Sequence, residues 1–341
     1  MKFCFVVGSL FKQKPHYTTT YLAHEAWRRG HEVAFASVGD FSLGRGNRIS
    51  ALCAKAPPRQ DWDRSTFLKA LQDYNLRWSP QNLADYDVLF LRFNPNTALE
   101  LEQAVFAPAL DLAQQLQESG VRVINQPEGL RRSASKLYLS RFPETVHPRL
   151  LVSRRKEDLK TFLLELKKPA ILKPLRGCGG RNVFLIRSAR EPNLNQILST
   201  LTDNGYVMAQ EYVPGPKPGD KRVLLFEGKI FARNGYPAIY RRVSPRGEIR
   251  SNIALGATAE ATEFTPDDLQ LVEQLRPQLR QDGLDFVGVD IVGNKVIEIN
   301  VFCPGGLGTL DRLYNLDLTP SILKSIESKK RHKQISLELQ Q

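Results

Sequence analysis

The chain has 341 residues, 42% of them hydrophobic and 25% charged, and its 48 lysines and arginines outnumber 36 acidic residues to give a net charge of +12. This length and composition predict two or three globular domains, and the basic charge is compatible with nucleic acid, an anionic membrane or small anionic substrates. No apolar run is long enough for a membrane helix, and the apolar run at the N-terminus is too short for a signal peptide. No CxxC spacing relates the cysteines, so we expect a cytoplasmic protein with free thiols at Cys4, Cys53, Cys178 and Cys303.

Residues 1–124 alternate predicted strands with predicted helices. Strands are expected over 2–8, just after Gly30, over 88–91 and over 121–125, and helices from 18 to Gly30 and over 98–120. This alternation is typical of a parallel α/β layer. Ligands bind beyond the carboxyl ends of such strands, which makes Arg92 and Asn94 candidates, although an ordinary surface arginine explains Arg92 equally well at this point. Neither GxGxxG nor a P-loop motif is present.

A glycine-rich turn joins two predicted strands within residues 168–186. Lys173 lies in the first strand, and RGCGG, Arg176–Gly180, follows it. An ammonium group beside unobstructed backbone N–H groups can form a cradle for an anion such as phosphate, because glycine lets the backbone approach closely. A hairpin with a flexible tip explains the same residues equally well. A domain boundary is expected near 125–127, followed by a helix that carries Lys136.

Positive charge concentrates in residues 221–250, which hold eight arginines and lysines against two glutamates. Arginine predominates there, and its planar fork suits carboxylate and phosphate groups. For this segment we therefore expect small anionic substrates rather than nucleic acid. Around it the pattern predicts a strand over 206–213, a hairpin that turns at Glu227-Gly228, and a helix over 265–282.

Residues 287–306, VGVDIVGNKVIEINVFCPGG, predict a buried hairpin that carries three oxygen-bearing side chains. Asp290, Glu298 and Asn300 are unusual in a core strand, because a buried charge needs a partner. A two-residue turn at Gly293-Asn294 would point the carboxylates to opposite faces, whereas a three-residue loop centred on Asn294 pairs them and keeps Asn300 on their face. Facing carboxylates repel unless a cation lies between them, and oxygen ligands suit Mg²⁺. We therefore expect the three-residue loop and a metal site.

Three segments in this order and spacing resemble the ATP-grasp ligases, most closely the prokaryotic-type glutathione synthetases. They are ILKPLRGCGG, MAQEYVPGPKPGDKRVLLFEGK and FVGVDIVGNKVIEINV, and NQPEGLRRSASKLYLSRF ahead of them is also similar. The resemblance implies an α/β protein, α+β in its C-terminal part, with a Rossmann-like parallel-sheet domain before an ATP-grasp fold. The implied parts are a substrate-side domain at 1–124, a central or lid subdomain at 125–207, a C-terminal subdomain with the metal site at 208–325 and a basic tail at 326–341.

The resemblance also implies roles for individual residues. Those matching nucleotide contacts are Lys136, Lys173, Arg176, Gly177, Gly179, Gly180, Gln210, Glu211, Tyr212 and Val213. Those matching contacts to the peptide substrate or its phosphorylated form are Arg92, Asp220, Arg222, Arg242, Arg250 and Asn252. Asp290, Glu298 and Asn300 match the ligands of two Mg²⁺ ions, for which Mn²⁺ is a substitute. Fixed positive charge for catalysis is expected from Arg242, Arg222, Lys173 and Arg250.

One segment departs from the family pattern. The glutathione synthetases continue after the last metal ligand with a small hydroxyl residue and a proline, whereas this chain has Cys303-Pro304-Gly305-Gly306. The amides of Gly305 and Gly306 would suit the carboxylate of an acceptor such as glycine. Cys303 is not expected to be a nucleophile, because ATP supplies the activation.

The implied reaction joins γ-glutamylcysteine to glycine, with ATP converted to ADP and phosphate through an acyl-phosphate intermediate. A mobile lid over residues 243–260 would keep water away from that intermediate. Two alternatives stay open: an ATP-grasp ligase with another donor or acceptor, and a non-catalytic nucleotide-binding module like the synapsins. We expect a homo-oligomer whose partners are small anionic molecules, with neither nucleic acid nor membrane, and a solvated C-terminal tail.

Overall fold

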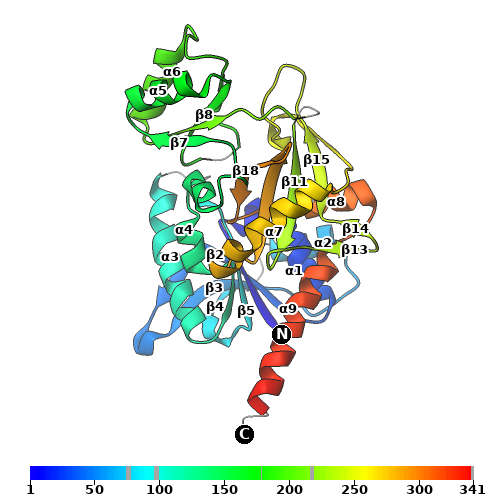
Figure 1. The fold of residues 1–341 in the computed structure, drawn as a ribbon. Helices are drawn as coiled ribbons and strands as arrows, with labels where there is room; N and C mark the ends of the chain where they lie inside the picture. The colour runs from blue at the N-terminus through cyan, green and yellow to red at the C-terminus, as the bar shows by residue number, and fades with distance from the viewer. Residues whose placement is uncertain (74–77, 96–99, 178, 216–218, 339–341) are drawn as a thin grey trace.

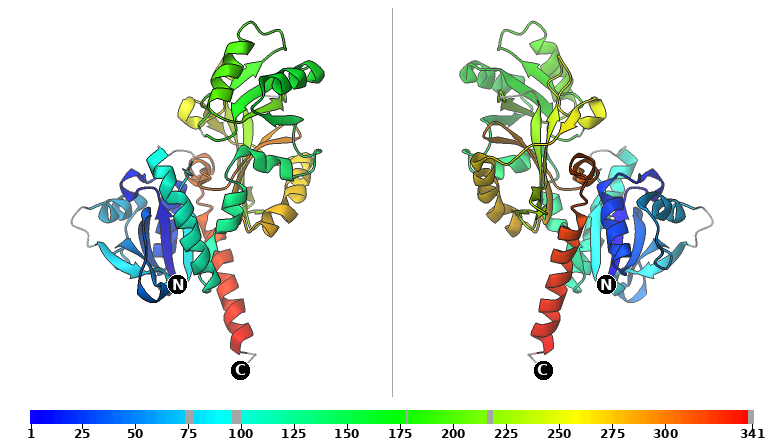
Figure 2. Two further views of the ribbon diagram at one scale, coloured as in Figure 1. Left: turned by 90° about the vertical axis from the view of Figure 1, so that its left-hand side faces the viewer. Right: turned by 90° about the vertical axis from the view of Figure 1, so that its right-hand side faces the viewer.

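Three sheets of four or more strands organise the part of the chain that the computed structural model describes, which is residues 1–73, 78–95, 100–177, 179–215 and 219–338. The N-terminal sheet and the C-terminal sheet lie on two sides of the molecule, and the four-stranded sheet with its helices projects beyond them (Figures 1 and 2). This arrangement agrees with the α/β class and the ATP-grasp fold expected from the sequence.

The N-terminal sheet has the strand order β4-β3-β2-β1-β5-β6. Its parallel strands are β1 (Lys2–Val7), β2 (Glu32–Leu43), β5 (Val88–Arg92) and β6 (Arg122–Ile124), and the prediction of a parallel layer is confirmed. Two strands that the sequence pattern did not indicate extend it in the antiparallel direction, β3 (Ile49–Lys55) and β4 (Trp78–Asn82).

Helices cover both faces of the N-terminal sheet, as the alternation along β1 requires. Phe3 and Phe5 face the core formed with α1 (Thr18–Arg28) and α2 (Arg64–Leu71). Cys4 and Val6 point to the other side, toward the core formed with α3 (Glu100–Glu118). Since both faces are covered, the strand can be apolar throughout.

The four-stranded sheet has the order β7-β10-β8-β9, and all its pairings are antiparallel. Its elements are β7 (Leu150–Ser153), α5 (Lys156–Leu166), β8 (Ala170–Pro174), β9 (Phe184–Ile186), α6 (Leu194–Asp203) and β10 (Val207–Glu211). Leucines from α5 and α6 pack against the strands to form a separate small core. The predicted strand, glycine-rich turn and strand within 168–186 are confirmed by β8 and β9.

The C-terminal sheet has the order β16-β15-β11-β17-β18, with β12 paired to β11. Its elements are β11 (Asp220–Phe226), β12 (Lys229–Ile230), β15 (Ile239–Val243), β16 (Thr258–Glu260), β17 (Phe286–Val292) and β18 (Lys295–Asn300), and β13 (Ala232–Arg233) and β14 (Tyr236–Pro237) form a separate ribbon. The turn at Glu227-Gly228 is confirmed, and both of its residues have positive φ, 54° and 70°.

Helix α7 (Pro266–Gln281) covers one face of the C-terminal sheet, and its ends agree with the prediction. Thr265 accepts a hydrogen bond from the backbone of Asp268, and the Asp268 side chain accepts one from the backbone of Thr265 in return. This capping box satisfies two backbone donors at the start of the helix.

The chain returns to the N-terminal sheet through α8 (Leu307–Tyr314) and α9 (Thr319–Glu338). Helix α9 packs on α1, and the carboxylate of Glu327 accepts hydrogen bonds from Arg29, at 2.5 Å, and from His31, at 2.7 Å. The segment predicted as a tail from residue 326 therefore begins inside a docked helix, whose end projects from the body (Figure 1). Across the described residues, none of the helices combines the length and the apolar character that crossing a bilayer requires.

Asn125 joins the N-terminal and C-terminal sheets at the predicted boundary, where α4 (Pro127–Arg132) follows. Its side-chain amide donates to the carbonyls of Phe286, at 2.8 Å, and Val301, at 2.7 Å, and its oxygen accepts from the Phe286 backbone at 2.7 Å. Only 2% of Asn125 is exposed, so water cannot replace these contacts.

Replacing Asn125 with alanine is expected to lower the free energy of unfolding by about 2–4 kcal/mol, because three buried backbone groups lose their partner. Urea unfolding followed by circular dichroism measures the change. Asn195→Ala, at an exposed position of α6, is the matched control and should stay within about 0.5 kcal/mol of the parent protein. Equal stability of the two variants would contradict the role of Asn125.

Candidate active site

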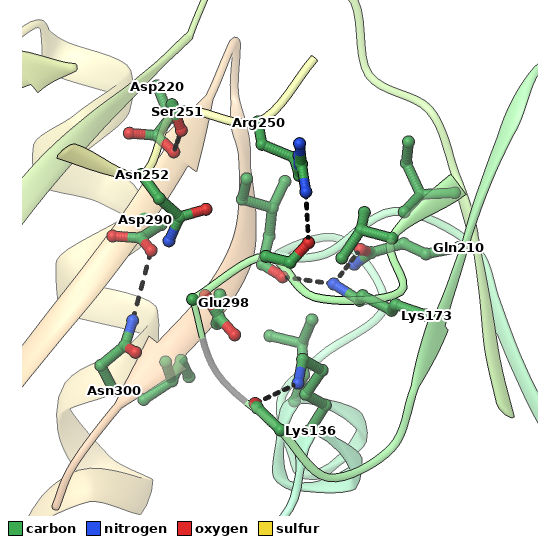
Figure 3. A pocket seen from close by; sticks show the side chains of 18 of the residues that line it. Lys136, Lys173, Gln210, Asp220, Arg250, Ser251, Asn252, Asp290, Glu298 and Asn300 are labelled. Atoms are coloured by element: carbon green, nitrogen blue, oxygen red, sulfur yellow. Dashed lines mark hydrogen bonds between the residues drawn. The ribbon is translucent and has the colours of Figure 1, made fainter. Parts of the chain in front are cut away.

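A cavity of about 510 Å³ lies where the four-stranded sheet meets the C-terminal sheet (Figure 3). The predicted site residues that line it are Lys136, Lys173, Gly177, Gly179, Gly180, Gln210, Glu211, Tyr212, Val213, Asp220, Arg222, Arg242, Arg250, Asn252, Asp290, Glu298, Asn300 and Gly305. Three others, Arg92, Arg176 and Gly306, are not among the lining residues. The fold thus brings side chains from distant parts of the sequence to one place.

The β17–β18 hairpin places Asp290 directly opposite Glu298, as expected, but not through the expected loop. The turn consists of Gly293-Asn294 alone, between Val292 and Lys295, so the prediction of a three-residue loop was wrong. A β-bulge supplies the missing residue instead: the register shifts after Asp290, and Ile297 has no opposite residue. One extra residue between Asp290 and Glu298 brings the two side chains to the same face, whether that residue lies in the loop or in the strand.

A chain of alternating charges runs along one face of β15, β11 and β17. Asp220 lies opposite Arg242 in the sheet, and Arg222 lies opposite Asp290. Arg242 donates to both oxygens of Asp220, at 2.7 and 2.6 Å, and its Nη2 lies 2.9 Å from Asp290. Arg222 binds both oxygens of Asp290, through Nε and, at 2.9 Å, through Nη2. All four side chains are buried, so each charge has its partner within the protein.

The pKa shifts of the two carboxyl groups follow from these neighbours. Desolvation alone would raise the pKa of Asp290, but Arg222 and Arg242 outweigh it and lower that pKa to about 2. For Asp220, desolvation and the charge of Asp290 raise the pKa, and Arg242 compensates only in part. Asp290 therefore stays anionic at neutral pH and is available as a ligand for a cation.

Lys173 in β8 lies at the floor of the cavity and is only 8% exposed. Its ammonium group donates to Oε1 of Gln210 at 2.8 Å and to the carbonyl of Ile297 at 3.4 Å. Desolvation, assisted by the charge of Lys136, lowers the pKa of Lys173 to about 8, although Glu298 and Asp290 oppose the shift. The Nε2 atom of Gln210 is buried and has no hydrogen-bond partner in the protein, which leaves a donor for a ligand.

The glycine-rich loop after β8 forms another wall of the cavity. Gly177, Gly179 and Gly180 all have positive φ, at 123°, 69° and 72°, which L side chains rarely adopt. Lys136, at the start of the 3₁₀ helix Lys136–Arg141, donates to the Gly177 carbonyl at 2.8 Å. Cys178, the middle residue of the predicted cradle, lies outside the described residues.

The segment after β10 lines the cavity with Glu211, Tyr212 and Val213. The backbone N–H groups of Glu211 and Tyr212 bond to the carbonyls of Arg149, at 2.8 Å, and Pro169, at 2.9 Å. The carboxylate of Glu211 accepts from Lys168 at 2.7 Å. These contacts fix the segment after β10 in a defined position beside the cavity.

Arg92 ends β5 and is buried behind the wall rather than within the cavity. It donates to the hydroxyl of Thr19 at 3.2 Å and to the carbonyl of Pro304 at 2.9 Å, and burial lowers its pKa. Gly305 lines the cavity, but the backbone N–H of Gly306 donates to the Thr18 hydroxyl at 3.1 Å. The N–H of Gly306 is therefore already used within the protein. Of the two glycine amides expected to bind the acceptor carboxylate, the one of Gly305 remains as a candidate.

Sequence reasoning missed several polar residues of the cavity, among them Ser251, Ser244 and Glu248. Ser251 donates its hydroxyl to Asp220, and Ser244 has a buried hydroxyl without a partner in the protein. Glu248 binds Arg250 and also lines the cavity. Ser244 could have been found from the sequence. It follows Arg242 by two residues, and side chains two residues apart in a strand point to the same face.

Comparison with known families and proteins agrees with this geometry. The sequence model of the prokaryotic glutathione synthetase N-terminal domain matches residues 1–131, and that of the prokaryotic glutathione synthetase ATP-grasp domain matches residues 135–315. The glutathione synthetase of Escherichia coli (strain K12) is 33% identical over 307 residues, which cover 89% of this chain and 90% of that protein. The glutathione synthetase of Synechococcus elongatus is 31% identical, over 96% of this chain and 98% of that protein.

Solved structures show the same fold at lower sequence identity. The ATP-grasp ligase PsnB complexed with a minimal precursor has a TM-score of 0.64 and 18% identity, over 96% of this chain and 98% of its own. The D-cycloserine synthetase DcsG has a TM-score of 0.61 and 15% identity, over 95% of this chain and 100% of its own. Since the family models match nearly the whole chain and its relatives align over most of their lengths, the chain belongs to the prokaryotic glutathione synthetase family.

Proposed function

We propose that this ligase joins γ-glutamylcysteine to glycine, with ATP converted to ADP and phosphate. The observation that carries the proposal is a single cavity in which two lysines, an arginine pair and three oxygen ligands converge, in a chain whose two halves both match the family. The cationic side of the cavity suits a triphosphate, and its carboxylate side suits the divalent ions that accompany one. The curated relatives are ATP-grasp glutathione synthetases, which supports the same pair of substrates.

The chemical task of the site is to make a carboxylate reactive toward an amine. Transfer of the γ-phosphoryl group of ATP to the carboxylate of the dipeptide gives an acyl-phosphate, which the amine of glycine then attacks as phosphate leaves. Lys136, Lys173 and Gln210 line the cavity, and we expect the two lysines to neutralise phosphate oxygens and the unpaired Gln210 amide to donate to the adenine. Arg242 and Arg222 supply fixed positive charge for the negative charge that develops on the transferred group.

The donor set of the hairpin fits Mg²⁺. Asp290, Glu298 and Asn300 offer carboxylate and amide oxygens from one face of β17 and β18, and Asn300 already orients its amide by donating to Asp290 at 3.2 Å (Figure 3). Among the described residues no group of three histidine, cysteine or acidic side chains gathers, which speaks against a transition-metal site and leaves an oxygen site completed by a substrate. Asp290, Glu298 and Asn300 would hold Mg²⁺, as two ions for which Mn²⁺ is a substitute, and the bound ions would supply positive charge against that of the ATP phosphates.

The reaction itself is the first test. Purified protein mixed with Mg²⁺-ATP, γ-glutamylcysteine and glycine is expected to release ADP and to form the tripeptide in equal amounts, as measured by a coupled ADP assay and mass spectrometry. Omitting either amino substrate is the control. No ADP above the background of the controls would contradict the proposal, and a faster reaction with another amino acid in place of glycine would reassign the acceptor beside Cys303 and Gly305.

Replacing Glu298 with glutamine is expected to weaken Mn²⁺ binding to the ADP complex about tenfold or more, because one anionic ligand is lost. Electron paramagnetic resonance of free Mn²⁺ measures the affinity without catalysis. Glu263→Gln, at an exposed position outside the cavity, is the matched control. Unchanged Mn²⁺ affinity in the Glu298 variant would contradict the metal assignment.

The affinity for a non-hydrolysable ATP analogue is expected to fall as the pH rises through 8. Burial lowers the pKa of Lys173 to about 8, so the free protein loses this positive charge above that pH, whereas bound phosphates favour the protonated form. The expected weakening is about tenfold between pH 8 and 9.5. Calorimetry over this range measures it, and Lys173→Arg, which stays charged, should show a flat profile. The same slope in both proteins would contradict the assignment.

A further inference from the structure

Residues 244–252, here called the arginine loop, connect β15 to the 3₁₀ helix Ile253–Leu255 and border the cavity. Arg250 lies at the place where this loop meets the glycine-rich loop, residues 175–182. Its Nη1 atom donates to the carbonyl of Gly180 at 3.0 Å (Figure 3). A Cβ atom placed on Gly180 would come within 2.9 Å of Arg250 and 2.7 Å of Asn252, so the two loops are packed tightly at this point.

Glu248 determines where the guanidinium of Arg250 points. Its Oε1 atom accepts from Nε of Arg250 at 3.0 Å, and its Oε2 atom accepts from Nη2 at 2.6 Å. The same Oε1 accepts from the backbone N–H groups of Ile249, at 2.8 Å, and Arg250, at 3.0 Å. Four hydrogen bonds thus hold one carboxylate inside its own loop, and the Nη1 edge of the arginine is left to face Gly180.

This arrangement differs from that of the other cavity arginines. Arg222 and Arg242 bind carboxylates that belong to neighbouring strands of the sheet, and they are rigid because the sheet is rigid. Arg250 has no such support, because its carboxylate lies two residues away in the same loop. Within the described part of the chain, Glu248 is the acidic residue that pairs with Arg250, so the position of the guanidinium depends on this carboxylate.

We infer that Glu248 is a positioning residue of the ligase: its carboxylate aims Arg250 at Gly180, and this contact makes the arginine loop and the glycine-rich loop close over the nucleotide as one unit. The inference rests on the proposed function, because the closed unit is what keeps water from the acyl-phosphate. Without the carboxylate, Arg250 is free to turn toward solvent, and the two loops separate. Part of the acyl-phosphate is then hydrolysed, so that ATP is consumed without tripeptide.

The first experiment measures coupling in the parent protein, Glu248→Gln and the exposed control Glu263→Gln. The expected result for Glu248→Gln is about a tenfold fall in the ratio of tripeptide formed to ADP released, with the control unchanged. A ratio equal to that of the parent protein would overturn the positioning role while the proposed function stands. A parent protein that releases no ADP would instead overturn the proposed function.

A second experiment asks whether Glu248 acts through Arg250. In a double-mutant cycle with Arg250→Gln, the Glu248→Gln change is expected to have no further effect on the coupling ratio, because the group it positions is already gone. Additive effects of the two changes would overturn the inference, since Glu248 would then act independently of the arginine.

A third experiment is independent of catalysis. Trypsin cleaves after arginine, and Arg246 is exposed in the arginine loop, four residues before Arg250. Cleavage of the ligand-free protein after Arg246 is expected to be about tenfold faster in Glu248→Gln than in the parent protein or in Glu263→Gln, because the loop opens more often. Equal cleavage rates in the three proteins would overturn the proposed contact between the loops.

Discussion

The site depends on a single constraint, the pairing of four buried charges across three neighbouring strands. Asp220, Arg242, Asp290 and Arg222 alternate in sign, and the register of the sheet places each acid opposite a base. Taking four charges out of water costs free energy that their attraction only partly returns, so an apolar face would serve stability at least as well. What the pairing does achieve is to keep Asp290 anionic and fixed in place, because both arginines bind it and lower its pKa.

The rest of the fold brings two lysines and the glycine-rich loop beside this charged face. Lys173 comes from a different sheet, with its own small core, and reaches the hairpin through the carbonyl of Ile297. The N-terminal sheet closes the other side, where Arg92 supports the wall by binding the Pro304 carbonyl. Helix α9 and Asn125 tie that sheet to the C-terminal one. The cavity is therefore a junction of separately folded layers, which suits an enzyme that must admit and release three substrates.

Sequence reasoning predicted the local features well, because each is determined by neighbouring residues. The turn at Glu227-Gly228, the extent of α7 and the strands on either side of the glycine-rich loop all follow from short patterns. The family resemblance, not the patterns, brought the distant segments to one site. Pairing between strands that are distant in the sequence was beyond reach, so the contacts of Arg222 and Arg242 with their acids could not be foreseen. Gly306 was misjudged for the same reason, since its partner Thr18 lies far away in the sequence.

The bulge at Ile297 does two things that a longer loop could not do together. It turns Glu298 to the face of Asp290, and it presents an unpaired stretch of backbone whose carbonyl receives the ammonium group of Lys173. In an unbulged hairpin of the same length, the two-residue turn would place Ile297 opposite Asp290 and point Glu298 to the other face. The two-residue turn at Gly293-Asn294 and the facing carboxylates are thereby reconciled, because the extra residue lies within the strand and not at the tip of the hairpin.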